Sequence, residues 1–321
     1  MKNRIFIFSI LLSLGCSQNN QFNLKPPRGY PNFTLLKWAA YLGFLDFVDL
    51  EPEIPDSIQV SRDIVYKETD QRPLKLDIYK DKFLVEPAPV IIFIHGGSWT
   101  TGGKEDYLIY CLAYAQKGYV TASLSYRFSQ EAIFPAAVED IICGIRWIKA
   151  HAGEYGIDSS KVALVGGSAG GHLAMLAAYT ADESYFASGC DENAVSTAVQ
   201  AIVNIYGPSD LTTDFAVAQG ATPKFMGATY DVNPDIYKVA SPITYITPDD
   251  PPTLTLHGTI DKIVPITQSD FLDKALITND VIHEYHRLKG WSHTMDASVP
   301  VNEYAQKVMT RFFNEWLNGD D

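Results

Sequence analysis

The chain has 321 residues, of which 46% are hydrophobic and 20% are charged, a balance typical of a globular protein with a sizeable core. Its 38 acidic and 25 basic residues give a formal net charge of −13. An acidic chain without a cluster of basic residues is a poor candidate for binding nucleic acid or an anionic lipid surface.

The first residues predict an export signal. Lys2 and Arg4 precede an apolar run over residues 5–12, which is too short to anchor a protein permanently across a bilayer. The sequence Leu-Gly-Cys that ends at Cys16 resembles the end of a bacterial lipoprotein signal, which implies cleavage before Cys16 and lipidation of that cysteine. An ordinary secretory signal is the alternative. We therefore expect residues 1–16 to form a signal of this type that is cleaved before Cys16, and the exported bacterial protein to be anchored through Cys16 at a periplasmic or cell-surface membrane.

Residues 17–57 divide into two parts. Residues 17–32 are polar and contain prolines, which predicts a tether. Residues 33–48, FTLLKWAAYLGFLDFV, are unusually apolar and are predicted to be helical. Because apolar helices are usually buried, we favour an extra helix packed on the core, with a lid or a membrane-surface helix as alternatives. Pro52 and Pro55 close this segment.

From residue 58 to residue 319, predicted strands and helices alternate. The clearest helical periodicity runs from Pro135 toward His151, and another predicted helix runs from Val301 to Leu317. Several strands are continuous apolar runs, as in parallel sheets that are covered on both faces. This order predicts an α/β fold with a mostly parallel central sheet and helices on both faces. The predicted strands cover residues 58–67, 74–79, 90–94, 119–125, 162–165, 201–206, 252–256 and 281–288.

The cysteines give little structural information. If Cys16 is lipidated, Cys111, Cys143 and Cys190 remain, and an odd number at scattered positions does not indicate a disulfide framework. No Cys or Cys/His spacing suggests a zinc site, so no metal is predicted. Cys111 and Cys143 are interpreted as small apolar residues on helices.

A predicted strand is joined to a predicted helix through GGSAG, residues 166–170, which matches the pattern G-x-S-x-G. In this setting the serine lies in a strained turn, and its neighbours must be small because the strand and helix backbones nearly touch. The start of the helix directs free N–H groups and partial positive charge toward whatever Ser168 attacks. Ser168 is therefore the predicted nucleophile, whereas His172 is interpreted as a packing or hydrogen-bonding residue.

A serine hydroxyl needs a base to take its proton. Of the seven histidines, His293 is favoured, because it lies in the polar loop 289–294 between the last predicted strand and the last predicted helix. The orienting acid is predicted to be Asp261, which follows the strand ending at His257 and can reach back over the sheet edge to the imidazole. Asp210 is the alternative acid, and a helix N-cap is the alternative role for Asp261.

The loop HGGSW, residues 95–99, follows another apolar strand. Acyl transfer builds negative charge on a carbonyl oxygen, and backbone donors placed in advance stabilise that charge. The N–H of Ala169 is one predicted donor, and Gly97 and Ser98 are predicted to supply others because glycine lets a backbone approach the substrate closely. Trp99 is expected to pack beneath the loop or to line the substrate pocket. A plain strand-to-helix connection is the alternative.

Four motifs occur in one order within residues 58–317, namely HGGSW, GGSAGG, HGTIDKIVP and GWSH. Together they resemble the α/β-hydrolase serine esterases near the hormone-sensitive-lipase group and the feruloyl and acetyl esterase (BD-FAE-like) group. The resemblance implies the α/β-hydrolase fold, a small insertion over the active site around residues 207–250, and catalysis without a metal or cofactor. Residues 1–57 lie outside the resemblance.

The leading hypothesis is a serine carboxylesterase that works through an acyl-enzyme. Ser168 would attack the ester, His293 would move protons and Asp261 would orient His293. The substrate would be a small-molecule ester or, by analogy, the acetyl or feruloyl groups of a polysaccharide. The alternatives are an amide hydrolase (a peptidase or a formamidase), a lipase with residues 33–48 as its lid, and a binding protein that has lost catalysis.

Overall fold

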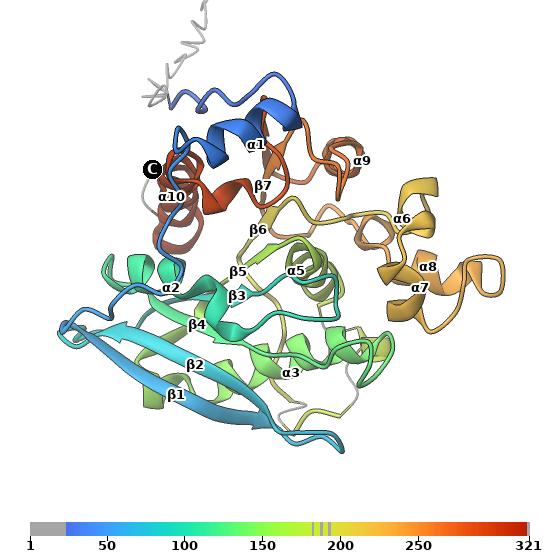
Figure 1. Cartoon of the computed structure of the whole chain (residues 1–321). Helices are drawn as coiled ribbons and strands as arrows, with labels where there is room; N and C mark the ends of the chain where they lie inside the picture. The colour runs from blue at the N-terminus through green and yellow to red at the C-terminus, as the bar shows by residue number, and fades with distance from the viewer. Residues whose placement is uncertain (1–23, 182, 187–188, 192–193, 320–321) are drawn as a thin grey trace, which may run out of the picture.

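The computed structural model describes residues 24–181, 183–186, 189–191 and 194–319, and within these ranges eight strands form a single sheet (Figure 1). In chain order the strands are β1 (Ile58–Lys67), β2 (Leu74–Asp81), β3 (Ala88–Ile94), β4 (Val120–Leu124), β5 (Ile157–Gly167), β6 (Ala201–Ile205), β7 (Thr253–Gly258) and β8 (His283–Leu288). Their spatial order is β1-β2-β4-β3-β5-β6-β7-β8. Antiparallel pairing joins β1 to β2 and β2 to β4, and every other neighbouring pair is parallel. All eight predicted strands are present, so the prediction of a mostly parallel sheet is confirmed.

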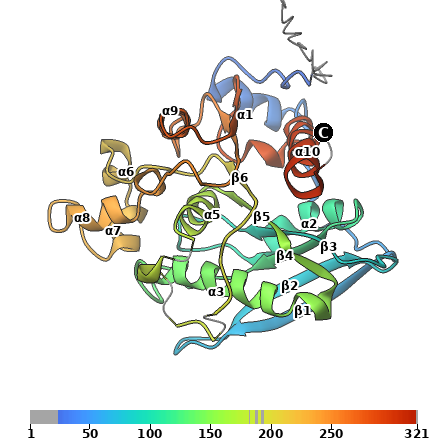
Figure 2. The same cartoon turned by 180° about the vertical axis from the view of Figure 1, so that it is seen from behind.

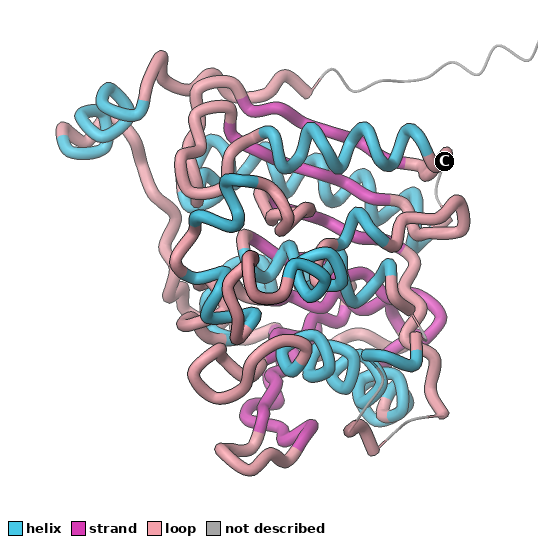
Figure 3. Tube along the Cα trace, turned by 90° about the vertical axis from the view of Figure 1, so that its right-hand side faces the viewer, coloured by secondary structure: helices cyan, strands magenta, loops and turns pink. Residues whose placement is uncertain are grey.

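Helices cover both faces of this sheet, and its central strands are buried on both sides. Along β3, Ile92 packs with one hydrophobic cluster while Ile91 and Phe93 pack with the other, as the alternation of side chains along a strand requires. The first cluster includes α3 (Ala136–Ala150), α5 (Ala169–Tyr179) and α9 (Thr267–Thr278), and the second includes α2 (Leu108–Ala115) and α10 (Val299–Phe313). Figure 2 shows these helices from behind, and Figure 3 shows the chain from the side with helices and strands in different colours.

The two helices predicted most clearly are present. Helix α3 begins directly after Pro135, and Val138, Ile141 and Ile148 on its inner face are fully buried. Helix α10 begins two residues before the predicted start and is followed by a short π-helical turn, Asn314–Asn318. In both helices the apolar residues recur with helical spacing, which is why the sequence reveals them.

Three short α-helices occupy the span between β6 and β7, where the resemblance implies an insertion. They are α6 (Asp214–Ala218), α7 (Ala221–Met226) and α8 (Pro234–Val239). They lie together at one side of the molecule in Figure 1. The backbone N–H of Phe134 donates to the carbonyl of Phe225, which ties the insertion to the segment before α3.

The interpretation of Cys143 as an unpaired apolar residue is wrong. Cys143 forms a disulfide with Cys190, 47 residues later, while Cys111 is a buried free thiol. Cys190 lies in the loop after α5, and this loop returns across α3, where Arg146 Nε donates to the carbonyl of Val195 at 2.9 Å. This proximity is a product of tertiary structure, so the spacing of the cysteines does not reveal it.

The apolar segment 33–48 also differs from its prediction. Helix α1 spans only Phe33–Tyr41, and Ala39 is its one buried residue. Trp38 and Phe44 are 55% and 78% exposed, so only one side of this segment packs on the core. The helix ends because Gly43 adopts a left-handed conformation with φ of 74°. A narrow stripe that includes Leu36 makes the contact with the second hydrophobic cluster.

Residues 24–32, predicted as part of a tether, lie against the body of the protein. The N–H of Gly29 donates to the carbonyl of Lys289 at 3.0 Å, and the N–H of Tyr30 donates to Gly290 at 2.8 Å. The predicted signal and Cys16 lie outside the described residues. Across the described part of the chain, no helix combines the length and the apolar composition needed to cross a membrane.

Candidate active site

Ser168 lies in the sharp turn between β5 and α5. Its φ of 55° and ψ of −122° are rare for a residue with a side chain, as expected for a strained turn. A Cβ atom at Gly166 would lie 2.2 Å from the carbonyl oxygen of Gly170, and one at Gly170 would lie 2.0 Å from that of Ile94. The glycines are therefore required by the close approach of β5, α5 and β3, and the turn holds the Ser168 hydroxyl at the edge of a cavity.

The three predicted triad residues meet at the carboxyl edge of the sheet. His293 Nε2 lies 3.0 Å from Ser168 Oγ, and His293 Nδ1 lies 2.6 Å from Asp261 Oδ2. With its proton on Nδ1, the imidazole donates to Asp261 and leaves Nε2 free to accept the hydroxyl proton of Ser168. The side chain of Asp261 is fully buried and that of His293 is 9% exposed, so water competes little for these hydrogen bonds.

Three groups besides His293 hold Asp261 in place. Its Oδ1 accepts the N–H groups of Ile263 at 2.8 Å and Val264 at 3.0 Å, and its Oδ2 also lies 3.2 Å from His257 Nε2. Burial alone would raise the pKa of Asp261, but the hydrogen bonds from His257 and His293 outweigh burial and lower this pKa to about 2. Asp261 is thus a carboxylate at neutral pH and can stabilise an imidazolium on His293.

The alternative acid, Asp210, has a different role. Its Oδ1 accepts the backbone N–H of Thr212 at 2.9 Å and the Thr212 hydroxyl at 2.6 Å, at the start of the insertion. Within the described ranges it has no hydrogen bond to His293. The turn formed by Asp261 with Ile263 and Val264 resembles the predicted cap, but α9 begins later, at Thr267.

Four residues of the site were missed by the sequence reasoning. His257 Nδ1 lies 2.7 Å from Ser269 Oγ, which orients the ring whose other nitrogen faces Asp261. The Tyr206 ring lies 4.5 Å from the His293 ring, centroid to centroid, and its hydroxyl donates to the buried carboxylate of Asp296. Tyr206 and His257 stand at the carboxyl ends of β6 and β7, and that position beside the predicted catalytic loops is the signal that could have found them.

The HGGSW loop has an unusual backbone. Gly97, Ser98 and Trp99 all have positive φ, at 103°, 53° and 57°. A Cβ atom at Gly97 would lie 2.0 Å from the carbonyl oxygen of Thr101, so only glycine fits there. Among the described residues, none accepts a hydrogen bond from the N–H of Gly97, Ser98 or Ala169. Ser98 and Ala169 line the same cavity as Ser168, which is the arrangement that a developing oxyanion requires.

Trp99 joins this loop to the insertion. Its ring stacks on Phe225 with 4.6 Å between centroids, and its Nε1 donates to His172 Nδ1 at 3.3 Å. The other nitrogen of His172 donates to the carbonyl of Ala240 at 2.7 Å. Trp99 thus packs beneath the loop and also lines the cavity, so both alternatives for this residue hold.

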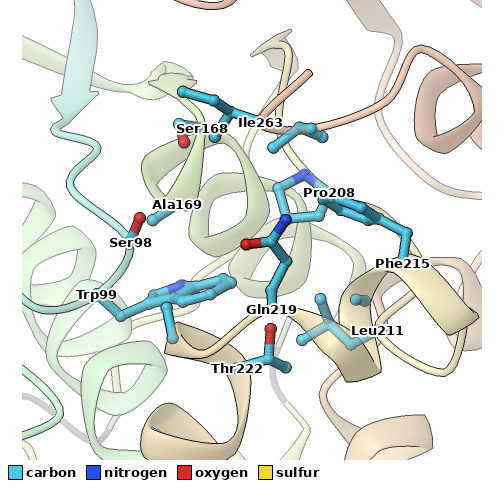
Figure 4. Close-up of a pocket in the computed structure, with 13 residues that line it drawn as sticks. Ser98, Trp99, Ser168, Ala169, Pro208, Leu211, Phe215, Gln219, Thr222 and Ile263 are labelled. Atoms are coloured by element: carbon cyan, nitrogen blue, oxygen red, sulfur yellow. The ribbon is translucent and has the colours of Figure 1, made fainter. Parts of the chain in front are cut away.

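The cavity beside Ser168 is small, about 40 Å³. Figure 4 shows Ser98, Ala169 and Ser168 along one side of it, with Phe215 and Gln219 of the insertion facing them. Its shape and lining can receive a short, mostly apolar group next to the Ser168 hydroxyl. Within the described ranges, no group of three or more His, Cys, Asp or Glu side chains is arranged to hold a metal ion.

Comparison with protein families matches residues 76–276 to the BD-FAE family. The "probable carboxylic ester hydrolase LipM" of Mycobacterium tuberculosis is 35% identical over 247 residues, which are 73% of this chain and 56% of that protein. "Esterase LipC" of the same organism is 31% identical over 230 residues, 69% of this chain and 57% of that protein. The chain therefore spans about half the length of these curated relatives.

Solved structures are similar over most of the chain. A "bifunctional GH43-CE" of Bacteroides eggerthii matches with a TM-score of 0.73 and 29% identity, over 83% of this chain and 39% of that one. "Thermogutta terrifontis esterase 2" phosphorylated by paraoxon matches with a TM-score of 0.68 and 25% identity, over 84% and 97%. The α/β-hydrolase fold expected from the sequence is confirmed.

Buried His172 predicts a dependence of stability on pH. Burial lowers the pKa of His172 to about 4, from an ordinary value of 6.5, so between these values the unfolded chain binds a proton that the folded chain excludes. Stability should therefore fall as the pH drops through this window. The penalty should be about 2 kcal/mol at pH 4.5.

We expect the variant His172→Gln to lack this contribution. Urea unfolding at pH 7.5 and pH 4.5 should give a difference in unfolding free energy between wild type and variant that shrinks by about 2 kcal/mol at the lower pH. A wild-type-to-His172→Gln difference that is equal at both pH values would contradict the assignment of a buried neutral imidazole.

Proposed function

The chain belongs to the BD-FAE family, and from this premise we propose that it is a serine carboxylesterase that works through an acyl-enzyme on Ser168. The observation that carries the proposal is the continuous line of hydrogen bonds from Ser168 to His293 and from His293 to Asp261. The similarity to LipM and LipC, whose names describe a carboxylic ester hydrolase and an esterase, supports the type of reaction.

Acylation begins with the Ser168 hydroxyl. As Oγ attacks the ester carbonyl carbon, His293 Nε2 takes the hydroxyl proton, and the carbonyl oxygen becomes an oxyanion. The N–H groups of Gly97, Ser98 and Ala169 donate to this oxygen, and in other hydrolases one such donor contributes about 3–4 kcal/mol. Asp261 stays ionised and stabilises the imidazolium on His293.

The tetrahedral intermediate then collapses. The imidazolium gives its Nε2 proton to the ester oxygen, the bond from that oxygen to carbon breaks, and the alcohol leaves. In the second half of the cycle, a water molecule attacks the acyl-enzyme while His293 takes its proton. When the second tetrahedral intermediate collapses, His293 returns the proton to Ser168 Oγ and the carboxylic acid is released. His293 therefore carries the proton in both halves of the cycle.

The cavity beside Ser168 favours a short acyl group. Its volume is about 40 Å³, and Phe215 and Gln219 of the insertion form part of its wall. An acetyl methyl group fits this space, whereas a feruloyl group requires the insertion to move. We therefore propose acetyl esters as the preferred substrates. We also propose acetylated polysaccharide as the natural substrate, by analogy with the feruloyl and acetyl esterases whose motifs this sequence resembles.

The place of action is also part of the proposal. The basic residues and apolar run before Cys16 support export, and lipidation of Cys16 would hold the enzyme at a bacterial membrane. The amide-hydrolase and lipase hypotheses stay predictions. Assays with acetanilides and with emulsified long-chain esters would separate both from a short-chain esterase.

Removal of the nucleophile tests the proposed reaction. Ser168→Ala should lower kcat/KM for p-nitrophenyl acetate by about 10⁵-fold or more, and Asp261→Asn by about 10⁴-fold, because both act in the same proton transfer. Ser160→Ala, at an exposed position on β5, is the matched control and should retain full activity. If Ser168→Ala keeps the fold by circular dichroism and still turns over within tenfold of wild type, the proposed nucleophile is refuted.

The size of the acyl cavity predicts selectivity. Across p-nitrophenyl acetate, butyrate and octanoate, kcat/KM should fall by at least about tenfold from acetate to octanoate, since longer chains collide with the insertion. Phe215→Ala should open the cavity and shift the preference toward butyrate, while the exposed Phe271→Ala on α9 should not. A rate that rises with chain length in the wild type would argue against a small acyl site.

A further inference from the structure

A second and larger cavity lies beside His293. It has a volume of about 270 Å³ and is lined by Phe33, Leu36 and Phe47 from the segment before the hydrolase domain and by Lys262, Trp291 and His293 from the domain itself. We propose that this cavity binds the alcohol part of the ester, and that residues 24–48 determine which alcohols fit. This inference rests on the proposed esterase function and extends it to the leaving group.

The position of the catalytic proton indicates which cavity binds the alcohol part of the ester and which binds the acyl part. The alcohol oxygen must take its proton from His293 Nε2, so the alcohol has to leave beside His293. The larger cavity is lined by His293, whereas the smaller one is lined by Ser168 together with Ser98 and Ala169. Ile263 lines both cavities, which makes it the boundary between them. An ester whose carbonyl carbon lies at Ser168 Oγ can therefore extend its acyl group one way and its alcohol the other.

The segment 24–48 is attached to the loop that carries His293 at both ends of that loop. At the first end, Trp291 Nε1 donates to the carbonyl of Pro27 at 2.9 Å, close to the hydrogen bonds of Gly29 and Tyr30. At the second end, the N–H of Val48 donates to Ala297 and the N–H of Val299 donates to Asp46, each at 2.9 Å.

Helix α1 bridges these two attachments, so Phe33 and Phe47 are held over the cavity by backbone contacts on either side. Residues 24–48 lie outside the range that matches the BD-FAE family, and so this wall belongs to the segment that precedes the hydrolase domain.

The lining indicates the kind of alcohol. Phe33, Phe47 and Trp291 are aromatic, and Phe47 is 57% exposed, so a ligand that covered it would remove apolar surface from water. Lys262 Nζ lies 5.8 Å from the centre of the Phe33 ring, and Ser292 adds a hydroxyl to the lining. A flat apolar wall with a few polar groups suits a cyclic alcohol with an apolar face and a polar edge, and the volume exceeds what a simple alkyl alcohol fills.

The inference can be tested with two acetate esters that share one acyl-enzyme. Methyl acetate and benzyl acetate differ only in the alcohol, and the ratio of their kcat/KM values measures how well a ring is bound. Phe47→Ala and Phe33→Ala should lower the ratio of benzyl to methyl acetate by about tenfold, mainly through KM for benzyl acetate. Phe47→Leu, which keeps apolar volume but loses the flat ring, should give an intermediate ratio.

Phe44→Ala is the matched control, because Phe44 is 78% exposed on the same segment and does not line the cavity. It should leave the ratio as in wild type. If Phe47→Ala and Phe33→Ala also leave it unchanged, or if Phe44→Ala changes it equally, the cavity is not the alcohol site and the exposed aromatic residues serve some other contact. An inactive wild type would instead overturn the proposed function, and the inference with it.

Discussion

The hydrogen bonds that join Ser168, His293 and Asp261 are the constraint on which the rest of the site depends. His293 stands 125 residues from Ser168 and 32 from Asp261 in the sequence, yet the two distances are 3.0 Å and 2.6 Å. Parallel strands bring this about, because β5, β7 and β8 end at one edge of the sheet and each delivers one side chain. Two backbone N–H groups and His257 also hydrogen-bond to Asp261, and they help to keep this buried carboxylate ionised beside the imidazole of His293.

Two further sets of contacts fix the groups around this line. Trp99 and His172 connect the HGGSW loop to α5 and to the insertion, so the wall of the small cavity and the N–H groups of the loop are positioned by one buried network. On the other side, residues 24–48 form hydrogen bonds with the loop that carries His293, and the ring of Tyr206 contacts the imidazole of His293. Ser168 thus lines a small cavity whose wall includes the insertion, and His293 lines a larger cavity whose wall includes the N-terminal segment.

Local patterns in the sequence predicted the parts of the molecule that local physics determines. Continuous apolar runs revealed the strands, helical spacing revealed α3 and α10, and the glycines at residues 95–99 and 166–170 marked the turns. The disulfide of Cys143 and the exposed face of α1 could not be predicted in this way. Each depends on which surfaces meet after folding. The apolar composition of residues 33–48 does not show whether this segment is a buried helix or one wall of a surface cavity.

The central claim is that Ser168 is the activated nucleophile of this chain, and stoichiometric labelling with an organophosphate such as paraoxon tests it most directly. Phosphorylation requires a hydroxyl whose proton a neighbouring base removes, so the rate reports on the line of hydrogen bonds as well as on the serine. We predict one diethylphosphoryl group per chain, found by peptide mapping on Ser168, and a loss of rapid labelling in His293→Ala. Labelling at another residue, or equally fast labelling of His293→Ala, would contradict the account.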